Sequence, residues 1–219
     1  MIQLPPSAQV ASFDVDAQKT FSPLCPDELP VPEGDRIAPE LNRQAELAGW
    51  RLGSKDAHTP QAVWVTDDPE LIGQPGVPGA NVEEHWPVHA VPGTPGFELL
   101  PGLPHPAEYD FFVWKGVEPD MHPYGACYHD LAEKRSTGVI EWLKAREVDC
   151  VLVGGLATDY CVRATALQLR AAGFDVILNL AACRGIAASS TDAALEEMRA
   201  AGIGIISDSS ALQVAAGGD

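Results

Sequence analysis

The last third of the chain carries the feature that most limits its fold, an alternation of apolar runs with segments of helical periodicity. Cys150 to Gly155 and Phe174 to Leu180 have the composition of buried strands, and Tyr160 to Ala172 repeats apolar residues at helical spacing. A second helix is predicted over Ser190 to Ala201 and a last strand near Ile203 to Ile206. Strands that alternate with helices usually pair in parallel. We therefore expect an α/β fold with three layers, α/β/α, around a mostly parallel central sheet.

The first half of the chain adds further strands. They are predicted over Gln9 to Val15, Trp50 to Lys55 and Tyr109 to Trp114, with one helix over Pro39 to Ala48. We expect one domain comprising residues 1–219, with a core from about 9 to 208, a Pro- and Gly-rich loop for metal and substrate at about 56–106, and a frayed end over residues 215–219.

Charge and cysteine content exclude several classes of protein. Asp and Glu outnumber Lys and Arg by 31 to 14, giving a formal charge of −17 that repels nucleic acid and anionic membranes. The sequence contains neither a basic region followed by an apolar run at its start nor an apolar stretch of the ~20 residues that span a bilayer. The five cysteines are widely spaced, without a Cys-x-x-Cys pair. We expect a cytoplasmic protein without a disulfide framework, and apolar helix faces that fit a domain core and a homo-oligomer interface equally well.

Three side chains with catalytic chemistry follow predicted strands. Asp16 follows the first strand, Lys115 ends the Phe-Phe-Val-Trp run, and Cys161 lies after the Val-Leu-Val-Gly-Gly strand at the start of a helix. Ligands of open parallel sheets bind beyond the carboxyl ends of the strands. We therefore expect these three residues to meet there, with Asp14 as a competitor for the role of Asp16.

Cys161 is the best candidate nucleophile. A helix N-terminus and a nearby lysine both favour the thiolate, although a lone cysteine is more often an inert apolar side chain. The glycines at 154 and 155 permit an unusual backbone path into the helix. On that path, the amides of Ala157 and Cys161 could both point at one oxyanion.

A second cluster is suited to a metal ion. Asp56, His58 and His89 offer one oxygen and two nitrogen donors, a set for one divalent ion, with Zn²⁺ preferred and Fe²⁺ or Mn²⁺ as alternatives. His85, four residues before His89, is a rival ligand. We expect the remaining histidines to lie at the surface, namely His105, His122 and His129.

These residues lie in motifs that resemble those of the isochorismatase-like cysteine hydrolases. Asp16-Ala-Gln-Lys-Thr-Phe21, Lys115-Gly116 and Gly155-Leu-Ala-Thr-Asp-Tyr-Cys161-Val162 are similar to the family's catalytic motifs. Asp56-x-His58 and Trp86-Pro-Val-His89 resemble the metal-binding elements of the nicotinamidases within that family. The resemblance covers roughly residues 12–208.

The resemblance implies an isochorismatase-like hydrolase fold and hydrolysis of nicotinamide to nicotinic acid and ammonia through a thioester on Cys161, with Asp16 as base and Lys115 beside it. It also implies a cis peptide between Leu156 and Ala157. An aromatic slot for a planar ring would be formed by Phe21, Trp86 and Tyr124.

Some positions depart from the family pattern. Ala57 stands where nicotinamidases usually have Trp, Ala90 replaces the usual Cys, and Tyr124-Gly-Ala-Cys127 replaces Tyr-Ser-Ala-Phe. The His-x-Ser-Phe element is also missing from the loop that follows His58. We therefore expect an altered pocket near the ring, and an extra metal ligand that is either missing or supplied elsewhere.

Three other functions remain open on the sequence. The chain could hydrolyse another small amide or a ureido compound with the same nucleophile. It could be a metallohydrolase in which Asp56, His58 and His89 activate water directly. It could also be a non-enzymatic interaction protein, although retention of all three candidate catalytic residues argues against this.

Overall fold

The central sheet brings the two halves of the chain together. The computed structural model describes residues 1–76 and 81–215. Within these residues a six-stranded parallel sheet has the order β4-β3-β2-β5-β6-β7, which confirms the predicted parallel sheet. Its strands and helices are, in chain order, β2 (Val10–Val15), α1 (Ala38–Ala45), β3 (Trp50–Asp56), β4 (Phe111–Lys115), α2 (Val139–Lys144), β5 (Cys150–Leu156), α3 (Arg163–Ala171), β6 (Asp175–Arg184), α4 (Ala188–Ala200) and β7 (Gly204–Ile206).

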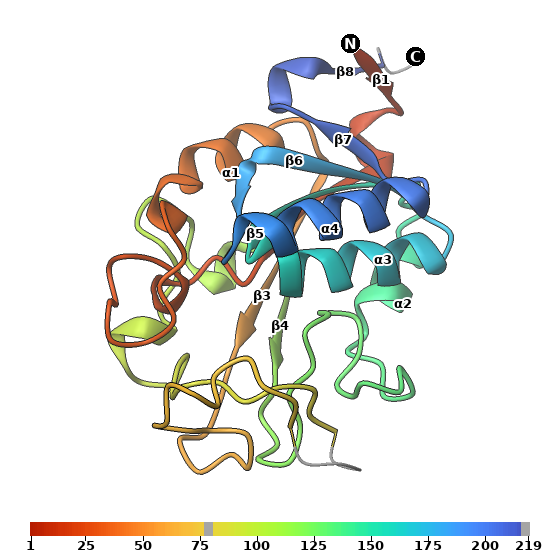
Figure 1. The fold of residues 1–219 in the computed structure, drawn as a ribbon. Helices are drawn as coiled ribbons and strands as arrows, with labels where there is room; N and C mark the ends of the chain where they lie inside the picture. The colour runs from red at the N-terminus through yellow and green to blue at the C-terminus, as the bar shows by residue number, and fades with distance from the viewer. Residues whose placement is uncertain (77–80, 216–219) are drawn as a thin grey trace.

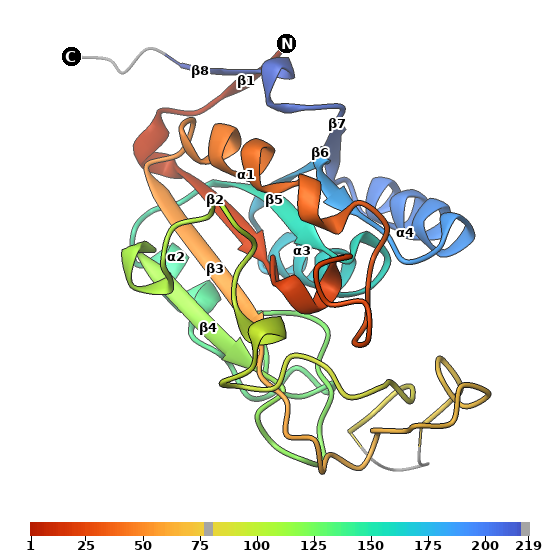
Figure 2. The same ribbon diagram turned by 90° about the vertical axis from the view of Figure 1, so that its left-hand side faces the viewer.

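Helices cover both faces of the sheet, as Figures 1 and 2 show. Helix α1 packs on β2, β5 and β6, and its Leu41 is completely buried in one apolar cluster. Helices α2, α3 and α4 lie on the other face, where Ala166, Leu169 and Met198 belong to a second cluster. Burial of apolar residues on both sides of the sheet is the main source of stability for such a layered fold. The predicted three-layer architecture is confirmed.

The topology fixes where a ligand can bind. Strands β2 and β5 are neighbours in the sheet. The chain leads from β2 through α1 to β3, which lies on one side of this pair in the strand order, and from β5 through α3 to β6, which lies on the other side. The carboxyl ends of β2 and β5 therefore form the topological switch point of the sheet, where open α/β sheets bind their ligands. The connection between β3 and β4 passes beyond the carboxyl ends of these strands, at the lower end of the molecule in Figure 1. Positions 77–80 of this predicted loop lie outside the described residues.

Several elements differ from their predicted bounds. Helix α1 ends at Ala45, and β6 continues to Arg184, where the sequence lacks the apolar run that predicted its first half. Helix α2, the short strands β1 (Ile2–Leu4) and β8 (Leu212–Val214), and their parallel pairing were not predicted. A helix of six residues is too short to show helical periodicity, and the two strands have only three residues each. Of the predicted frayed end, residues 216–219 lie outside the description.

Of the helices in the described part of the chain, none has the length and apolar character needed to cross a membrane.

Candidate active site

The three candidate catalytic residues come from three strand ends and meet in one buried cluster. Asp16 follows β2 with a left-handed backbone (φ 45°), and Lys115 is the last residue of β4. Cys161 lies in a π-helical turn, Thr158–Val162, in which the amide of Val162 donates to the carbonyl of Ala157 at 3.1 Å. Such π-helical turns are frequent at functional sites.

Lys115 lies at the centre of this cluster and is completely buried. Its Nζ is 3.0 Å from Asp16 Oδ2 and 3.5 Å from Cys161 Sγ, and it also donates to Asp56 Oδ1 and, at 3.1 Å, to the carbonyl of Pro123. The acidic oxygens of Asp16 and Asp56 and the sulfur of Cys161 all lie within 4.8 Å of one another. A nucleophile, a carboxylate base and a cation are thus within reach of one substrate atom.

Two polar side chains that sequence reasoning missed hold the carboxylates in place. Ser54 Oγ donates to Asp16 Oδ1 at 2.7 Å and accepts from the Asp16 amide at 3.2 Å. The amide group of Gln18 accepts from the Asp56 backbone N–H at 2.8 Å and donates to the Asp56 carbonyl at 3.0 Å. Alternation along β3 places Ser54 and Asp56 on the same side of the strand, and this was the available signal for Ser54.

The two carboxyl groups of the cluster have opposite pKa shifts. Burial raises the pKa of Asp16 to about 6, although Lys115 lowers it in part. Burial also acts to raise the pKa of Asp56, but Lys115 and His58 more than offset this, so that its pKa lies below the ordinary value. The pKa of Lys115 is raised because Asp16 and Asp56 together outweigh its burial. Two carboxyl groups whose pKa values differ in this way are suited to separate tasks. Asp16 is the one able to exchange a proton near neutral pH.

The surroundings of Cys161 favour the thiol, despite the helix N-terminus and the lysine beside it. Burial raises the pKa of its thiol well above the ordinary value, Lys115 acts to lower this pKa, and the carboxylates of Asp16 and Asp56 act to raise it. The resting group is therefore a thiol, which needs a base to become a nucleophile. Asp14 is not available as that base, because its Oδ2 accepts from Arg51 at 2.7 Å and from the Tyr109 hydroxyl at 2.8 Å.

A cavity of about 290 Å³ opens onto Cys161. The three predicted aromatic residues Phe21, Trp86 and Tyr124 line it, and Trp86 Nε1 donates to the Tyr124 hydroxyl at 3.0 Å. Its small size and aromatic walls favour a small planar substrate. Three further apolar lining residues were not predicted: Leu29 and Ile186, which lie outside the catalytic motifs, and Tyr160, which directly precedes Cys161 in its motif.

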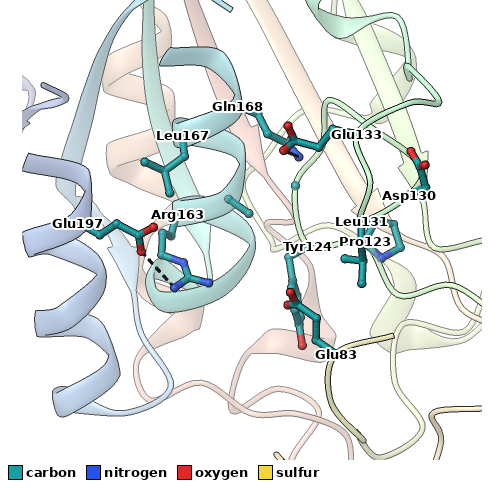
Figure 3. A pocket seen from close by; sticks show the side chains of 12 residues that line it. Glu83, Pro123, Tyr124, Asp130, Leu131, Glu133, Arg163, Leu167, Gln168 and Glu197 are labelled. Atoms are coloured by element: carbon teal, nitrogen blue, oxygen red, sulfur yellow. Dashed lines mark hydrogen bonds and ion pairs between the residues drawn. The ribbon is translucent and has the colours of Figure 1, made fainter. Parts of the chain in front are cut away.

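A second hollow lies behind Tyr124, between the chain near Asp130 and helices α3 and α4 (Figure 3). Its empty volume is about 620 Å³, and its lining includes Glu83, Glu133 and an Arg163–Glu197 ion pair of 3.3 Å. Cys161, Asp16 and Lys115 are not among the described residues that line it. Of these two cavities, the smaller one is therefore the candidate active site.

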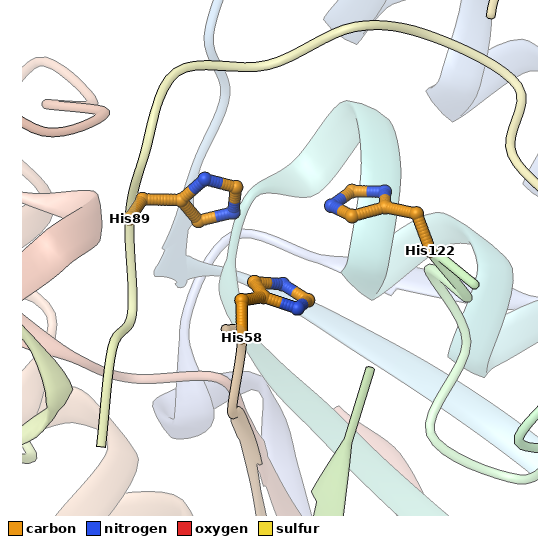
Figure 4. A group of neighbouring side chains, drawn as sticks. All are labelled: His58, His89 and His122. Atoms are coloured by element: carbon orange, nitrogen blue, oxygen red, sulfur yellow. The ribbon is translucent and has the colours of Figure 1, made fainter. Parts of the chain in front are cut away.

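Three imidazoles face one another beside the catalytic cluster (Figure 4). The nitrogens of His58, His89 and His122 lie within 4.8 Å of one another, and all three rings are buried. His58 Nδ1 is 2.9 Å from the Gly116 carbonyl, and His89 Nδ1 is 2.8 Å from the Pro87 carbonyl. In both of these rings the Nε2 atom is therefore left for an ion.

The predicted ligand Asp56 adjoins this histidine cluster, with its Oδ1 3.4 Å from His58 Nε2. Burial and the neighbouring His58 lower the pKa of His89 to about 3, and the same causes lower that of His122. Neutral imidazoles and a carboxylate are the donors that Zn²⁺, Fe²⁺ and Mn²⁺ use in proteins. The donor set therefore fits a divalent metal.

The other histidines do not join the cluster. His85 is half-buried, with its Nδ1 3.1 Å from the Trp64 carbonyl, and His105 accepts from the amide of Ala107. The prediction that His122 lies at the surface is wrong, because only 3% of it is exposed. Its flanking residues, Met121 and Pro123, gave no periodic signal of burial.

The peptide bond between Leu156 and Ala157 is cis, as the family resemblance implied. Both residues are buried, and Ala157 lines the cavity next to Cys161.

Comparison with known proteins gives a consistent result. Residues 14–210 match the isochorismatase domain family. A nicotinamidase of Escherichia coli strain K12 is 33% identical over 210 residues, which cover 91% of this chain and 93% of that protein. A solved pyrazinamidase of Pyrococcus horikoshii in complex with zinc is 33% identical, has a TM-score of 0.70, and is matched over 90% of this chain and 98% of its own. The yeast nicotinamidase bound to the inhibitor nicotinaldehyde is 25% identical, with a TM-score of 0.76 and coverage of 90% and 99%.

Proposed function

This chain belongs to the isochorismatase family, and from that membership we propose that it is a nicotinamidase, an amidohydrolase that converts nicotinamide to nicotinic acid and ammonia. One observation carries the proposal. Cys161, Lys115 and Asp16 form a buried cluster, and its Cys161 lines a small cavity with aromatic walls. The whole-length similarity to a nicotinamidase of Escherichia coli supports the choice of substrate.

In the first step, Cys161 attacks the carboxamide carbon of the substrate. The thiol proton passes to Asp16, the carbon–sulfur bond forms, and the electron pair of the carbonyl π bond moves onto the oxygen. We assign the amides of Ala157 and Cys161 to this oxyanion. Lys115 stays protonated and stabilises the negative charge that leaves Asp16 and appears at the substrate.

In the second step, the tetrahedral intermediate collapses to a thioester. Asp16 returns its proton to the nitrogen while the carbon–nitrogen bond breaks, so that ammonia leaves and not the far more basic amide ion. A water molecule then attacks the thioester, with Asp16 as its base, and the carbon–sulfur bond breaks to release nicotinic acid and the thiol. One carboxyl group thus serves both half-reactions.

A divalent metal, for which we propose Zn²⁺, would be held by Asp56, His58 and His89, and when bound it would supply a positive centre that positions the substrate in the cavity. The chain's own contribution is to hold these donors in place. The Gly116 and Pro87 carbonyls fix the orientation of the two imidazoles.

We further propose a cytoplasmic location. All five cysteines fall in the described part of the chain and are free thiols there, as expected in a reducing compartment.

The test is ammonia release from nicotinamide by purified wild type and by Cys161→Ala, each with and without prior chelation. We expect turnover by the wild type that the substitution abolishes and chelation diminishes. Turnover that survives in Cys161→Ala would instead favour a metallohydrolase. Turnover of other small amides, but not of nicotinamide, by metal-replete wild type would refute the proposed substrate.

A further inference from the structure

The buried ring of His122 has no hydrogen bond to either of its nitrogens. Neither Nδ1 nor Nε2 has a partner among residues 1–76 and 81–215, although the side chain is 97% buried. His58 and His89 differ, because the Nδ1 of each lies at hydrogen-bond distance from a backbone carbonyl. A buried polar group without a partner is costly to fold, so that its presence in a core calls for a ligand.

The position of this ring points to what that ligand is. The His122 ring stacks on His58 with ring centroids 4.9 Å apart and planes inclined by 27°, and its centroid lies 5.8 Å from that of His89. Trp64 and Tyr124 enclose it with centroids at 4.3 and 5.1 Å. Figure 4 shows the three imidazoles converging from different segments of the chain. The unpartnered nitrogens are therefore held between apolar walls and two other imidazoles.

We propose that His122 is a protein ligand of the metal, so that the ion is held by three imidazoles together with the carboxylate of Asp56. This inference rests on the proposed function only for the presence of a metal. His122 would be the extra metal ligand that the loop after His58 does not provide. His122 comes instead from the loop that follows β4.

This assignment has two chemical consequences. A set of three nitrogens and one oxygen favours Zn²⁺ over the harder ions Mn²⁺ and Mg²⁺, which prefer oxygen donors. It also ties the metal to the catalytic lysine, because the next residue, Pro123, accepts from Lys115 Nζ at 3.1 Å, and Tyr124 lines the substrate cavity. Binding of the ion at His122 would fix the segment that orients both groups.

The decisive measurement is X-ray absorption at the zinc edge of the wild-type protein loaded with one equivalent of Zn²⁺. We expect a fit that requires three imidazoles per ion, and two in His122→Phe, which keeps the ring packing but has no nitrogen donor. Two imidazoles in the wild type, or failure to retain zinc, would overturn the proposal. The number of imidazoles found in the wild-type protein does not depend on how any variant folds.

Zinc affinity, measured by competition with a chromophoric chelator, gives a second readout. We expect His122→Phe to bind Zn²⁺ at least about tenfold more weakly than wild type. His129→Phe, a half-buried histidine outside the cluster, should leave the affinity unchanged. Equal affinities for all three proteins would contradict the assignment. Because neither readout uses an amide, a protein that holds zinc on three imidazoles but does not hydrolyse nicotinamide would refute the proposed function alone.

Discussion

Lys115 Nζ lies 3.0 Å from Asp16 Oδ2, and neither side chain is exposed to solvent. A second carboxylate, that of Asp56, also accepts from this ammonium. With both acids ionised, the buried cluster holds two negative charges and one positive charge. Burial and these two carboxylates raise the pKa of the Cys161 thiol, and in the proposed mechanism its proton passes to Asp16 during attack. We therefore expect the thiolate to form only during attack on a substrate carbonyl.

Removal of the lysine charge is predicted to destabilise the fold and abolish turnover. Lys115→Met would leave two buried carboxylates without a cation, at a cost of about 3–5 kcal/mol. Urea unfolding measures this cost, and the loss should be smaller at pH 5 than at pH 8 because protonation removes the uncompensated charge. Lys144→Met, at an exposed position in α2, should change the free energy of unfolding by less than about 0.5 kcal/mol. Unfolding curves that coincide for the two variants would contradict the buried ion pair.

The pH dependence of hydrolysis should follow Asp16. Its base form is needed to accept the thiol proton, and burial raises its pKa to about 6, so kcat/KM is expected to fall as the pH drops through that value. The hydrogen bond from Ser54 stabilises the carboxylate and lowers this pKa. Ser54→Ala should therefore move the acid limb to higher pH. Ser12→Ala, in β2 but bonded to Gln44, should not move it. A limb that is unchanged in Ser54→Ala would exclude Asp16 as the titrating group.

A methyl group at position 116 should displace a metal ligand. Gly116 has φ 69°, and a Cβ there would lie 2.2 Å from Cε1 of His58. We predict that Gly116→Ala lowers zinc affinity at least about tenfold, measured by chelator competition. Gly102→Ala is the matched control, because Gly102 also has a positive φ, 93°, but a Cβ there has no neighbour within 4 Å among the described residues. Equal losses in both variants would mean that backbone strain, and not His58, accounts for the effect.

The Tyr124 hydroxyl is predicted to shape the cavity and not to take part in the chemistry. It accepts from Trp86 Nε1 at 3.0 Å and donates to Glu84 at 3.3 Å. Tyr124→Phe should raise KM for nicotinamide by about three- to tenfold, the range expected for one lost hydrogen bond, with a smaller change in kcat. Tyr128→Phe, outside the cavity lining, serves as the comparison. A loss mainly in kcat would give Tyr124 a catalytic role instead.

The sequence predicted the fold, and it predicted which polar residues follow the strands, because both depend on local patterns. Apolar runs that alternate with helical periodicity give parallel strands, and Asp16, Lys115 and Cys161 follow those runs. The family resemblance added the cis peptide at Leu156, which the structure confirms. The roles of these residues, the single domain and any oligomeric state stay predictions.

Features that depend on distant contacts could not be predicted from local patterns. His122 lies in a segment without periodicity. Its burial results from packing against His58 and Trp64, both of which are far from it in the sequence. The raised pKa of the Cys161 thiol was not predicted, for a related reason. The helix and the lysine were visible in the sequence, but the complete burial of the thiol beside two carboxylates was not.

The central claim is that the substrate is carried on Cys161, and acid quenching during turnover, followed by mass spectrometry, tests it most directly. Wild type mixed with excess nicotinamide is predicted to gain one nicotinoyl group on the peptide that contains Cys161. The buried-cysteine control Cys127→Ala should gain the same group, and Cys161→Ala should gain none and release no ammonia. Ammonia release by Cys161→Ala at a rate comparable to wild type, or acylation at another residue, would contradict the account.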